Sequence, residues 1–173
     1  RLIRESIWES RFNENGSVSR ESFASSEYDD AGNLIRSESR HTLYYYYASG
    51  SKRLEVGYMN SFDGSGVSTN GGDWKYEFNE QGALVFSYSG TYTCDSLGNR
   101  TNISYERRWY DELGRPIKSF RASEVNTYDE NSRIIATDGE YSWYDSFGTL
   151  TERTLVYRTL RYDEMGRLVE TEY

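Results

Sequence analysis

The chain contains one histidine and one cysteine, His41 and Cys94, and both residue types can supply the base or the nucleophile of an enzyme. Nucleophilic catalysis needs such groups side by side. His41 and Cys94 lie in different copies of a repeated pattern, and Cys94 takes the place of an aromatic residue in its copy. A small buried apolar side chain is therefore the better interpretation of the cysteine. The sequence predicts no catalytic residue and no enzyme.

Acidic residues are abundant, and the stretch STNGGDWKY at residues 68–76 resembles a loop that could bind calcium. Calcium loops gather several oxygen ligands within about a dozen residues. The repeated acids of this chain instead recur 16 to 18 residues apart, which is typical of turns. The sequence therefore predicts no metal site and no cofactor.

Aromatic residues are the strongest functional signal, with 17 Tyr, 7 Phe and 4 Trp in 173 residues. Side chains alternate between the two faces of a β-strand. This alternation places Tyr105 and Trp109, and likewise Tyr141 and Trp143, on the face opposite the aromatic residue of the nearby turn. Two interpretations remain open: both faces of the sheet are covered, one by a coiled neighbour and one by side-chain self-packing, or these rings form an exposed row that contacts a carbohydrate or a peptide.

The residues that must position these rings form a repeat of an aromatic residue, Asp or Asn, two spacers and Gly. The segment Tyr162-Asp163-Glu164-Met165-Gly166 is a complete copy. Ten copies, three of them degenerate, begin at residues 12, 28, 46, 62, 78, 94, 110, 128, 144 and 162. Every step between copies is 16 or 18 residues, and an even step is expected to keep the repeated aromatic residues on one face of a sheet.

This period fits two strands of about six residues with two tight connections, so each repeat is predicted to be a hairpin and the ten repeats to approach twenty strands. Apolar spacing typical of helices is scarce. The predicted fold is all-β: repeated antiparallel hairpins that form a long coiled sheet or a partial β-shell, in a single domain covering residues 1–173.

The repeated motif itself predicts a type I turn followed by a bulge. Its Asp or Asn accepts hydrogen bonds from the backbone, and its Gly takes a positive φ without a Cβ clash. The residue after Gly then faces the acid, and the next residue faces the aromatic ring. The predicted acid–base pairs are Asp111–Arg115, Asp129–Arg133 and Asp163–Arg167, and the predicted ring pairs are Tyr28–Leu34, Phe78–Leu84, Tyr128–Ile134, Tyr144–Leu150 and Tyr162–Leu168.

The phrase YDxxGRL, intact at Tyr162 to Leu168 and with Pro116 in its last place in the copy at Tyr110, resembles the YD repeat of RHS-repeat proteins. The resemblance covers residues 12 to 168. That family includes bacterial RHS toxins, the shell-forming parts of insecticidal toxin complexes and the animal teneurins, whose repeats wind as a β-ribbon into a hollow shell. The resemblance implies a wall-building module. The only proline follows Arg115, so the Asp-Pro motif of self-cleaving RHS toxins is not expected.

Composition and charge limit the partners. Only about 18% of the residues are Leu, Ile, Val or Phe, a share typical of disorder, but disordered chains are poor in aromatic residues. We therefore expect a folded protein with a thin, aromatic, partly hydrated core. A formal net charge of −8 repels phosphate backbones, so nucleic acid is not an expected partner. No apolar run approaches the length of a membrane span.

Two function classes remain open. The first is a non-catalytic structural repeat module, either the wall of an RHS-like shell or an interaction scaffold at a cell surface. The second is a module that binds carbohydrate or peptide on an aromatic sheet face. The expected partners are another protein, an enclosed polypeptide or a glycan, with self-association through edge strands as a further possibility. The expected location is outside the cytoplasm of a bacterium, in a chain that is either complete or a piece of a longer shell.

Overall fold

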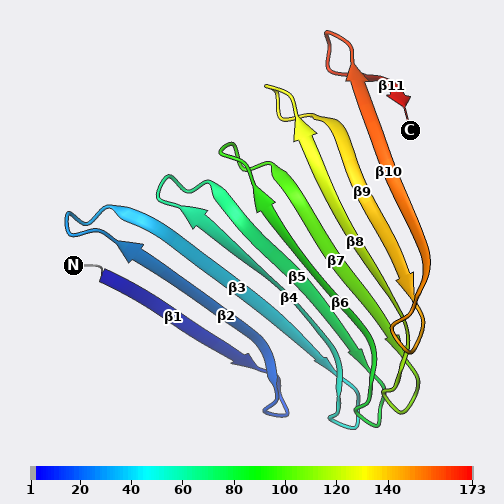
Figure 1. Ribbon diagram of the computed structural model, residues 1–173. Coiled ribbons are helices and arrows are strands. Elements are labelled where there is room, and N and C mark those ends of the chain that lie inside the picture. The colour runs from blue at the N-terminus through cyan, green and yellow to red at the C-terminus, as the bar shows by residue number, and fades with distance from the viewer. Residues whose placement is uncertain (1–2, 173) are drawn as a thin grey trace.

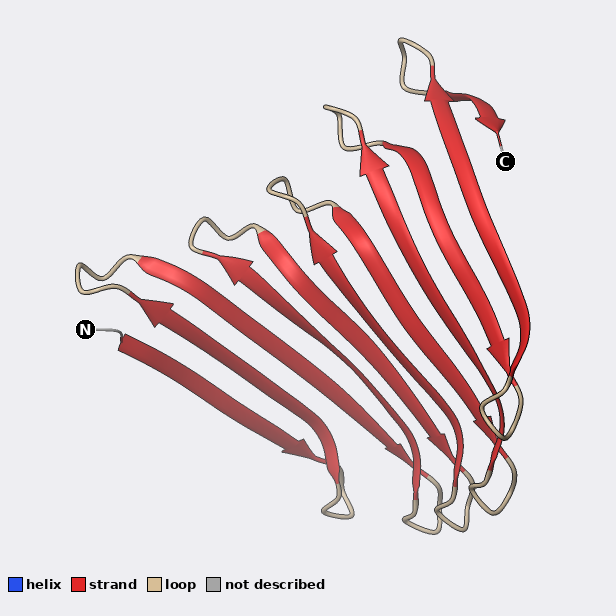
Figure 2. Ribbon diagram, in the orientation of Figure 1, coloured by secondary structure: helices blue, strands red, loops and turns tan. Residues whose placement is uncertain are grey.

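The computed structural model describes residues 3–172. Within that range it contains eleven β-strands and no helix (Figure 2). The strands are β1 (Ile3–Phe12), β2 (Val18–Tyr28), β3 (Leu34–Tyr46), β4 (Lys52–Asp63), β5 (Ser68–Phe78), β6 (Leu84–Cys94), β7 (Arg100–Tyr110), β8 (Pro116–Tyr128), β9 (Ile134–Tyr144), β10 (Leu150–Tyr162) and β11 (Leu168–Glu172).

All eleven strands form one sheet in which each strand pairs with its neighbours in the sequence, in the order β1 to β11. Every pairing is antiparallel, and Figure 1 shows the chain running back and forth from one edge of the sheet to the other. The sheet is open and uncurled. The prediction of an all-β fold built from consecutive antiparallel hairpins is confirmed, and the shell implied by the family resemblance stays a prediction.

The predicted number of strands is wrong. The ten turns join strands of mostly 11 to 13 residues, so each 16- or 18-residue repeat supplies one strand and one turn instead of two short strands and two connections. Successive turns consequently lie at opposite ends of the sheet (Figure 1). A strand of this length is stable here because both of its edges are hydrogen-bonded over nearly its whole length.

The turn chemistry matches the prediction in detail. In the copy at Tyr110, the Gly114 N–H donates to the Asp111 carbonyl oxygen at 2.9 Å, and the Asp111 N–H donates to the Arg115 carbonyl oxygen at 2.9 Å. The Asp111 carboxylate accepts hydrogen bonds from the Leu113 and Arg115 N–H groups and forms an ion pair with the Arg115 side chain. The same two backbone bonds close all ten turns, including the three degenerate copies.

Positive φ is required at the fourth position after the aromatic residue in every turn. Nine copies place glycine there, with φ between 76° and 88°. The copy at Tyr128 has Ser132 instead, at φ 59°.

The predicted ring pairs also lie directly opposite each other, for example Tyr128 and Ile134 or Tyr162 and Leu168.

A bulge follows each turn and changes the faces of the sheet. Phe12 lies opposite Val18, but the next pair is Arg11 and Arg20, so Ser19 is an extra residue. Each hairpin has such a residue at this place. One extra residue reverses the alternation of side chains. The prediction that an even step keeps the motif aromatics on one face is therefore wrong, because they switch face at each successive turn.

We name the two faces by residues that they carry. Face A carries His41, Tyr58, Tyr105 and Phe120, and face B carries the residues between them along each strand, such as Glu106. The motif aromatics point to face B at the end of the sheet that holds the turns at 12, 46, 78, 110 and 144. They point to face A at the other end, which holds the turns at 28, 62, 94, 128 and 162.

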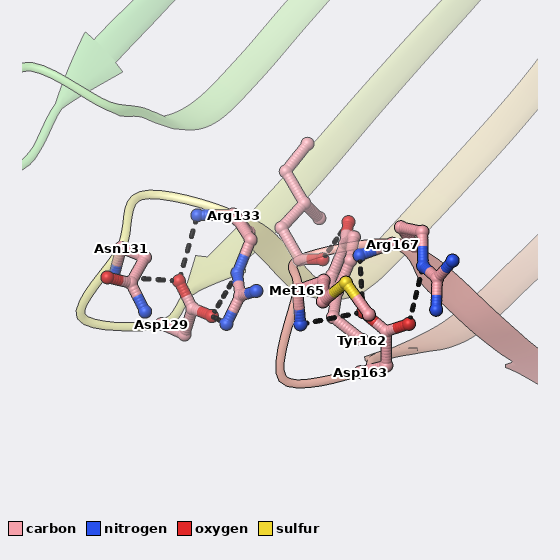
Figure 3. Close-up of polar contacts among 8 residues, drawn as sticks. Asp129, Asn131, Arg133, Tyr162, Asp163, Met165 and Arg167 are labelled. Carbon is pink, nitrogen blue, oxygen red and sulfur yellow. Dashed lines mark hydrogen bonds and ion pairs between the residues drawn. The ribbon is translucent and has the colours of Figure 1, made fainter.

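Tyrosine hydroxyls connect neighbouring turns at the same end of the sheet. The Tyr162 hydroxyl donates to the Ile134 carbonyl oxygen at 3.0 Å, so the Asp163 turn lies beside the Asp129 turn (Figure 3). Tyr46 and Tyr128 make the equivalent bond to the carbonyl oxygen 28 residues earlier. The motif tyrosine therefore stabilises both its own hairpin and the contact between consecutive hairpins.

Burial is low because the sheet is a single layer. Among the described residues, the buried apolar side chains are Phe120, which is 9% exposed, and Ala122, which is 3% exposed. The end strands are more exposed still, and every residue of β1 is exposed. No helix capable of crossing a membrane occurs in residues 3–172.

Candidate functional site

The four aromatic residues proposed from the sequence lie together on face A, on the adjacent strands β7 to β9. The Trp109 and Trp143 rings stack with their centroids 5.7 Å apart and their planes at 22°. Phe120, on the strand between them, lies 4.7 Å from Trp143, 6.1 Å from Tyr141 and 5.9 Å from Tyr105, measured between ring centroids. The four predicted residues are half-buried. Their mutual packing therefore covers much of each ring.

Two further rings extend this cluster onto β6. Phe86 lies edge-on to Trp109 at 5.6 Å, and Tyr88 lies 6.3 Å from Tyr105. We call the whole group the aromatic belt; its members are Phe86, Tyr88, Tyr105, Trp109, Phe120, Tyr141 and Trp143. The belt crosses four consecutive strands. The belt is on the other face of the sheet from the motif rings Tyr110 and Tyr144, as predicted. Because of the bulges, it shares its face with the Tyr128 and Tyr162 ring pairs at the other end of the sheet.

Two cations without an ion pair rest on the belt, beside Lys75, which lies 5.8 Å from the Phe86 ring and is paired with Glu77. The Lys118 ammonium lies 4.9 Å from the Trp109 ring and 5.4 Å from the Trp143 ring. The Arg107 guanidinium lies 5.3 Å from the Tyr105 ring and 6.0 Å from both the Tyr88 and Phe120 rings. Both side chains are exposed, and neither forms an ion pair with a carboxylate of the described chain. The belt thus presents positive charge on an aromatic surface.

A groove on the same face adjoins the belt at Tyr88, with a cavity volume of about 540 Å³. Leu43 and Val56 are among its lining residues. Gly57 has no side chain, and the Trp74 ring of face B occupies the place where a Cβ on Gly57 would lie. We call this cavity the β3–β5 groove. Its volume is within the range of small-molecule and side-chain binding pockets.

Histidine and cysteine are not brought together. His41 is on β3, with its ring 5.0 Å from that of Tyr58 at the side of the β3–β5 groove, and its buried Nδ1 has no hydrogen-bond partner among the described residues. Cys94 is at the end of β6, half-buried, with its Sγ 3.7 Å from the Ser68 Oγ. The strands β4 and β5 separate them. In residues 3–172, no group of three or more His, Cys, Asp or Glu side chains is placed to hold a metal ion.

Face B carries more ion pairs than face A, although its Arg40 rests on the Trp74 ring at 4.7 Å without a carboxylate partner in the described chain. Glu106 accepts hydrogen bonds from Arg108 and Arg121, both at 2.8 Å. Further ion pairs on this face are Arg36–Glu27, Lys52–Glu55 and Arg153–Glu140. Burial opposes ionisation of Glu106, but the hydrogen bonds from the two arginines outweigh it and lower the pKa of that carboxyl below its usual value.

On face A, several tyrosine hydroxyls have a pKa above their usual value. Burial against the neighbouring rings raises the pKa of Tyr88 and of Tyr105. It also raises the pKa of Tyr141 to about 12, with a further contribution from the Glu124 carboxylate, which accepts a hydrogen bond from the Tyr141 hydroxyl at 2.7 Å. These phenols stay neutral at physiological pH, so the belt offers neutral rings and uncompensated cations.

Sequence reasoning missed Phe86, Tyr88, Arg107, Lys118 and Phe120, although Phe120 is the centre of the belt. Their positions depend on which residues of different strands lie opposite one another, and the bulge after each turn sets that register. The usable signal was the Asp-x-x-Gly turn itself: placing one bulge after each turn would have aligned Arg107 with Phe120.

Comparison with protein-family models finds no match, and comparison with curated proteins finds no similar chain.

Proposed function

We propose that this chain is a non-catalytic structural module that acts as a wall or contact surface, and that face A is the face that contacts a partner. The observation that carries the proposal is the pairing state of the charges. Most arginines of face B form ion pairs, with Arg40 on the Trp74 ring as an exception, whereas Arg107 and Lys118 lie together on the aromatic belt of face A and have no carboxylate partner in the described chain. Such a surface is complementary to an acidic partner.

The repeat pattern supports a structural role. One backbone unit repeats along the sheet, so similar residue types occur in rows, which suits extended contact better than the converging groups that catalysis needs. The resemblance to YD repeats favours the same conclusion, because in those proteins the repeats enclose or display other segments. By the same resemblance, we propose that the module works outside the cytoplasm of a bacterium, at the cell surface or after export.

An activity screen tests the non-catalytic part. Hydrolysis of peptide, ester and glycosidic substrates is measured for the wild-type chain and for His41→Ala and Cys94→Ala. We expect no turnover above background for any of the three proteins. Turnover that either substitution abolishes would overturn the proposal and would identify that residue as the place to look.

Tryptophan emission tests the choice of face. The chain has four tryptophans, and a Trp8→Phe/Trp74→Phe variant retains only the two of the aromatic belt. A matched variant that retains only Trp8, on face B, is the control. We expect poly-L-glutamate to change the emission of the first variant and to leave the second unchanged, with poly-L-lysine inactive on both. A response to glycans alone would favour carbohydrate binding, and silence of the belt tryptophans to every polymer would contradict a contact role for face A.

A further inference from the structure

A continuous row of directly opposite residues crosses face A from β2 to β7 and runs through the β3–β5 groove. The pairs are Arg20–Leu43, Leu43–Val56, Val56–Lys75, Lys75–Tyr88 and Tyr88–Arg107. The row therefore begins and ends with arginine and has an apolar section in its first half.

The apolar section can receive a side chain. Leu43 and Val56 are opposite each other, and Tyr58 and Trp74 also line the groove. The Trp74 ring itself lies on face B, over Gly57. Burial of an aliphatic side chain in this groove removes apolar surface from water and is therefore favourable, although the groove remains open on one side.

The charges along the row leave the two ends free. Lys75 is paired with Glu77, and the Asp73 carboxylate, which lines the groove, accepts a hydrogen bond from the Tyr88 hydroxyl at 3.1 Å, so an incoming carboxylate finds no free cation in the middle of the row. Arg20 forms no ion pair with a carboxylate of residues 3–172, and Arg107 contacts only rings. Both arginines are thus available to a carboxylate from outside the chain.

We infer that this row is a binding site for an extended acidic peptide segment that carries an apolar residue two positions after its first acid. The inference rests on the proposed function and names the partner's chemistry: one carboxylate on Arg20, an aliphatic side chain in the β3–β5 groove, and a second carboxylate on Arg107. The aromatic belt continues from the Arg107 end, so further residues of the partner pass over Lys118 and the stacked tryptophans.

The spacing of the ligand follows from the sheet. Strands are about 4.8 Å apart, so Arg20 on β2 and Arg107 on β7 are separated by about 24 Å across the sheet. The Arg107 guanidinium lies over the Tyr88 and Tyr105 rings, 6.0 and 5.3 Å from them, and so is close to the groove side. An extended peptide advances about 3.4 Å per residue and alternates its side chains, so acids at its first and seventh positions span about 20 Å on the same side. The third position then lies over the groove.

A capped heptapeptide with Glu at positions 1 and 7, Leu at position 3, and Ser or Gly elsewhere is the probe. Its binding to the full chain is measured by isothermal titration calorimetry at low and at physiological salt. Replacing both Glu by Gln, or Leu by Ser, is expected to weaken binding about tenfold. A peptide of the same composition with Leu at position 4, which points away from the sheet, is expected to bind as weakly as the Ser variant.

Variants of the protein test each end of the row. Arg20→Gln and Arg107→Gln are each expected to raise the dissociation constant about fivefold, the size typical of one exposed charge pair. Val56→Phe fills the groove and is expected to remove the preference for Leu over Ser. Arg153→Gln changes the net charge equally but lies on face B, and is expected to leave binding within about twofold. Urea midpoints establish that each variant is folded.

The outcomes separate this inference from the proposed function. If poly-L-glutamate changes the emission of the belt tryptophans but the heptapeptide binds no better than its Gln or position-4 versions, the row is wrong and face A remains a contact surface. If Arg153→Gln weakens binding as much as Arg20→Gln, the attraction is a property of net charge and the site is overturned. If neither polymer nor peptide binds, both the row and the contact role of face A fail.

Discussion

The two faces of the sheet share one backbone but keep their charged side chains in different states. On face B, Glu106 neutralises Arg108 and Arg121, and the one described contact between two rings is Trp8 with Phe23. On face A, seven rings form a continuous belt, and Arg107 and Lys118 above it have no acidic partner in the described chain. The comparison teaches that a single-layer sheet can concentrate ion pairs on one face and packed rings on the other.

The largest difference between the faces is expected when a ring is removed from each: truncation at the centre of the belt should lower the free energy of unfolding more than truncation on face B. Phe120 contacts three rings of neighbouring strands, whereas Phe23 on face B contacts the Trp8 ring alone among described ring pairs. Phe120→Ala is expected to lower the free energy of unfolding by about 3 kcal/mol, the lower part of the range for buried aromatic residues. Phe23→Ala is expected to cost about half as much. Urea denaturation measures both, and equal losses would show that the belt is no more of a core than face B.

Turn residues belong to neither face and provide a reference. A side chain at positive φ costs about 1 to 2 kcal/mol, so Gly114→Val is expected to lower the urea midpoint, and Ser132→Gly to raise stability by about 1 kcal/mol. Neither change should alter the emission of the belt tryptophans in the folded state. A neutral or reversed pair of midpoints would mean that these positions are not under backbone strain.

Loss of one charge should matter more on face B. Glu106→Gln leaves two arginines without their carboxylate, and is expected to lower stability by about 0.5 to 1 kcal/mol at low salt, with a smaller loss at high salt. Lys118→Gln on face A removes no ion pair and is expected to change stability by less than about 0.5 kcal/mol. The experiment compares denaturation curves at two ionic strengths. A larger loss from Lys118→Gln would reverse the assignment of the faces.

Groups on the two faces should also lose their contributions to stability at opposite ends of the pH scale. The pKa of Glu106 is below its usual value of 4.5 in the fold, so its contribution to stability is present above pH 4.5 and is lost as the pH falls through the folded pKa. The pKa of Tyr141 is about 12 against a usual value of 10.0, so its contribution is present below pH 10 and is lost as the pH rises toward 12.

Unfolding midpoints between pH 2 and 12 would check this prediction. We expect Glu106→Gln to flatten the acid limb and Tyr141→Phe to flatten the alkaline limb. Tyr44 on face B also has its pKa raised to about 12, by burial and by the Glu21 carboxylate that accepts its hydrogen bond, so the alkaline measurement uses a Tyr44→Phe background. An alkaline limb that Tyr141→Phe leaves unchanged in that background would remove the difference between the faces.

The local parts of this structure were predictable because they depend on a few adjacent residues. Asp111, Gly114 and Arg115 specify their turn by hydrogen bonding and backbone conformation, and the opposition of Tyr162 and Leu168 follows from the turn. The strand length was not predictable in the same way. Two short strands and one long strand fit a 16-residue period equally well, and only the alternation of turns between the two ends of the sheet distinguishes them.

Part of the aromatic belt was predictable because it also depends only on residues close together in the sequence. Tyr105, Trp109, Tyr141 and Trp143 could be assigned to one face by counting within a strand, since no bulge lies between them and the turns at 110 and 144 that follow. Phe120 lies on a strand that runs the other way, beyond a bulge at Ile117, and its place opposite Trp143 depends on that extra residue. The β3–β5 groove is lined by residues of several strands, and its position also depends on the register between them.

The reversal of faces at each turn also limits how such a chain can grow. Duplication of one 16-residue repeat would place every later strand in the opposite direction and present all of its side chains on the opposite face, which would divide a belt that crosses β6 to β9. Duplication of two repeats together, 32 to 34 residues, would restore both direction and face. The unit of inheritance, and the unit by which an engineer could lengthen or shorten this sheet, is therefore a pair of strands with two turns.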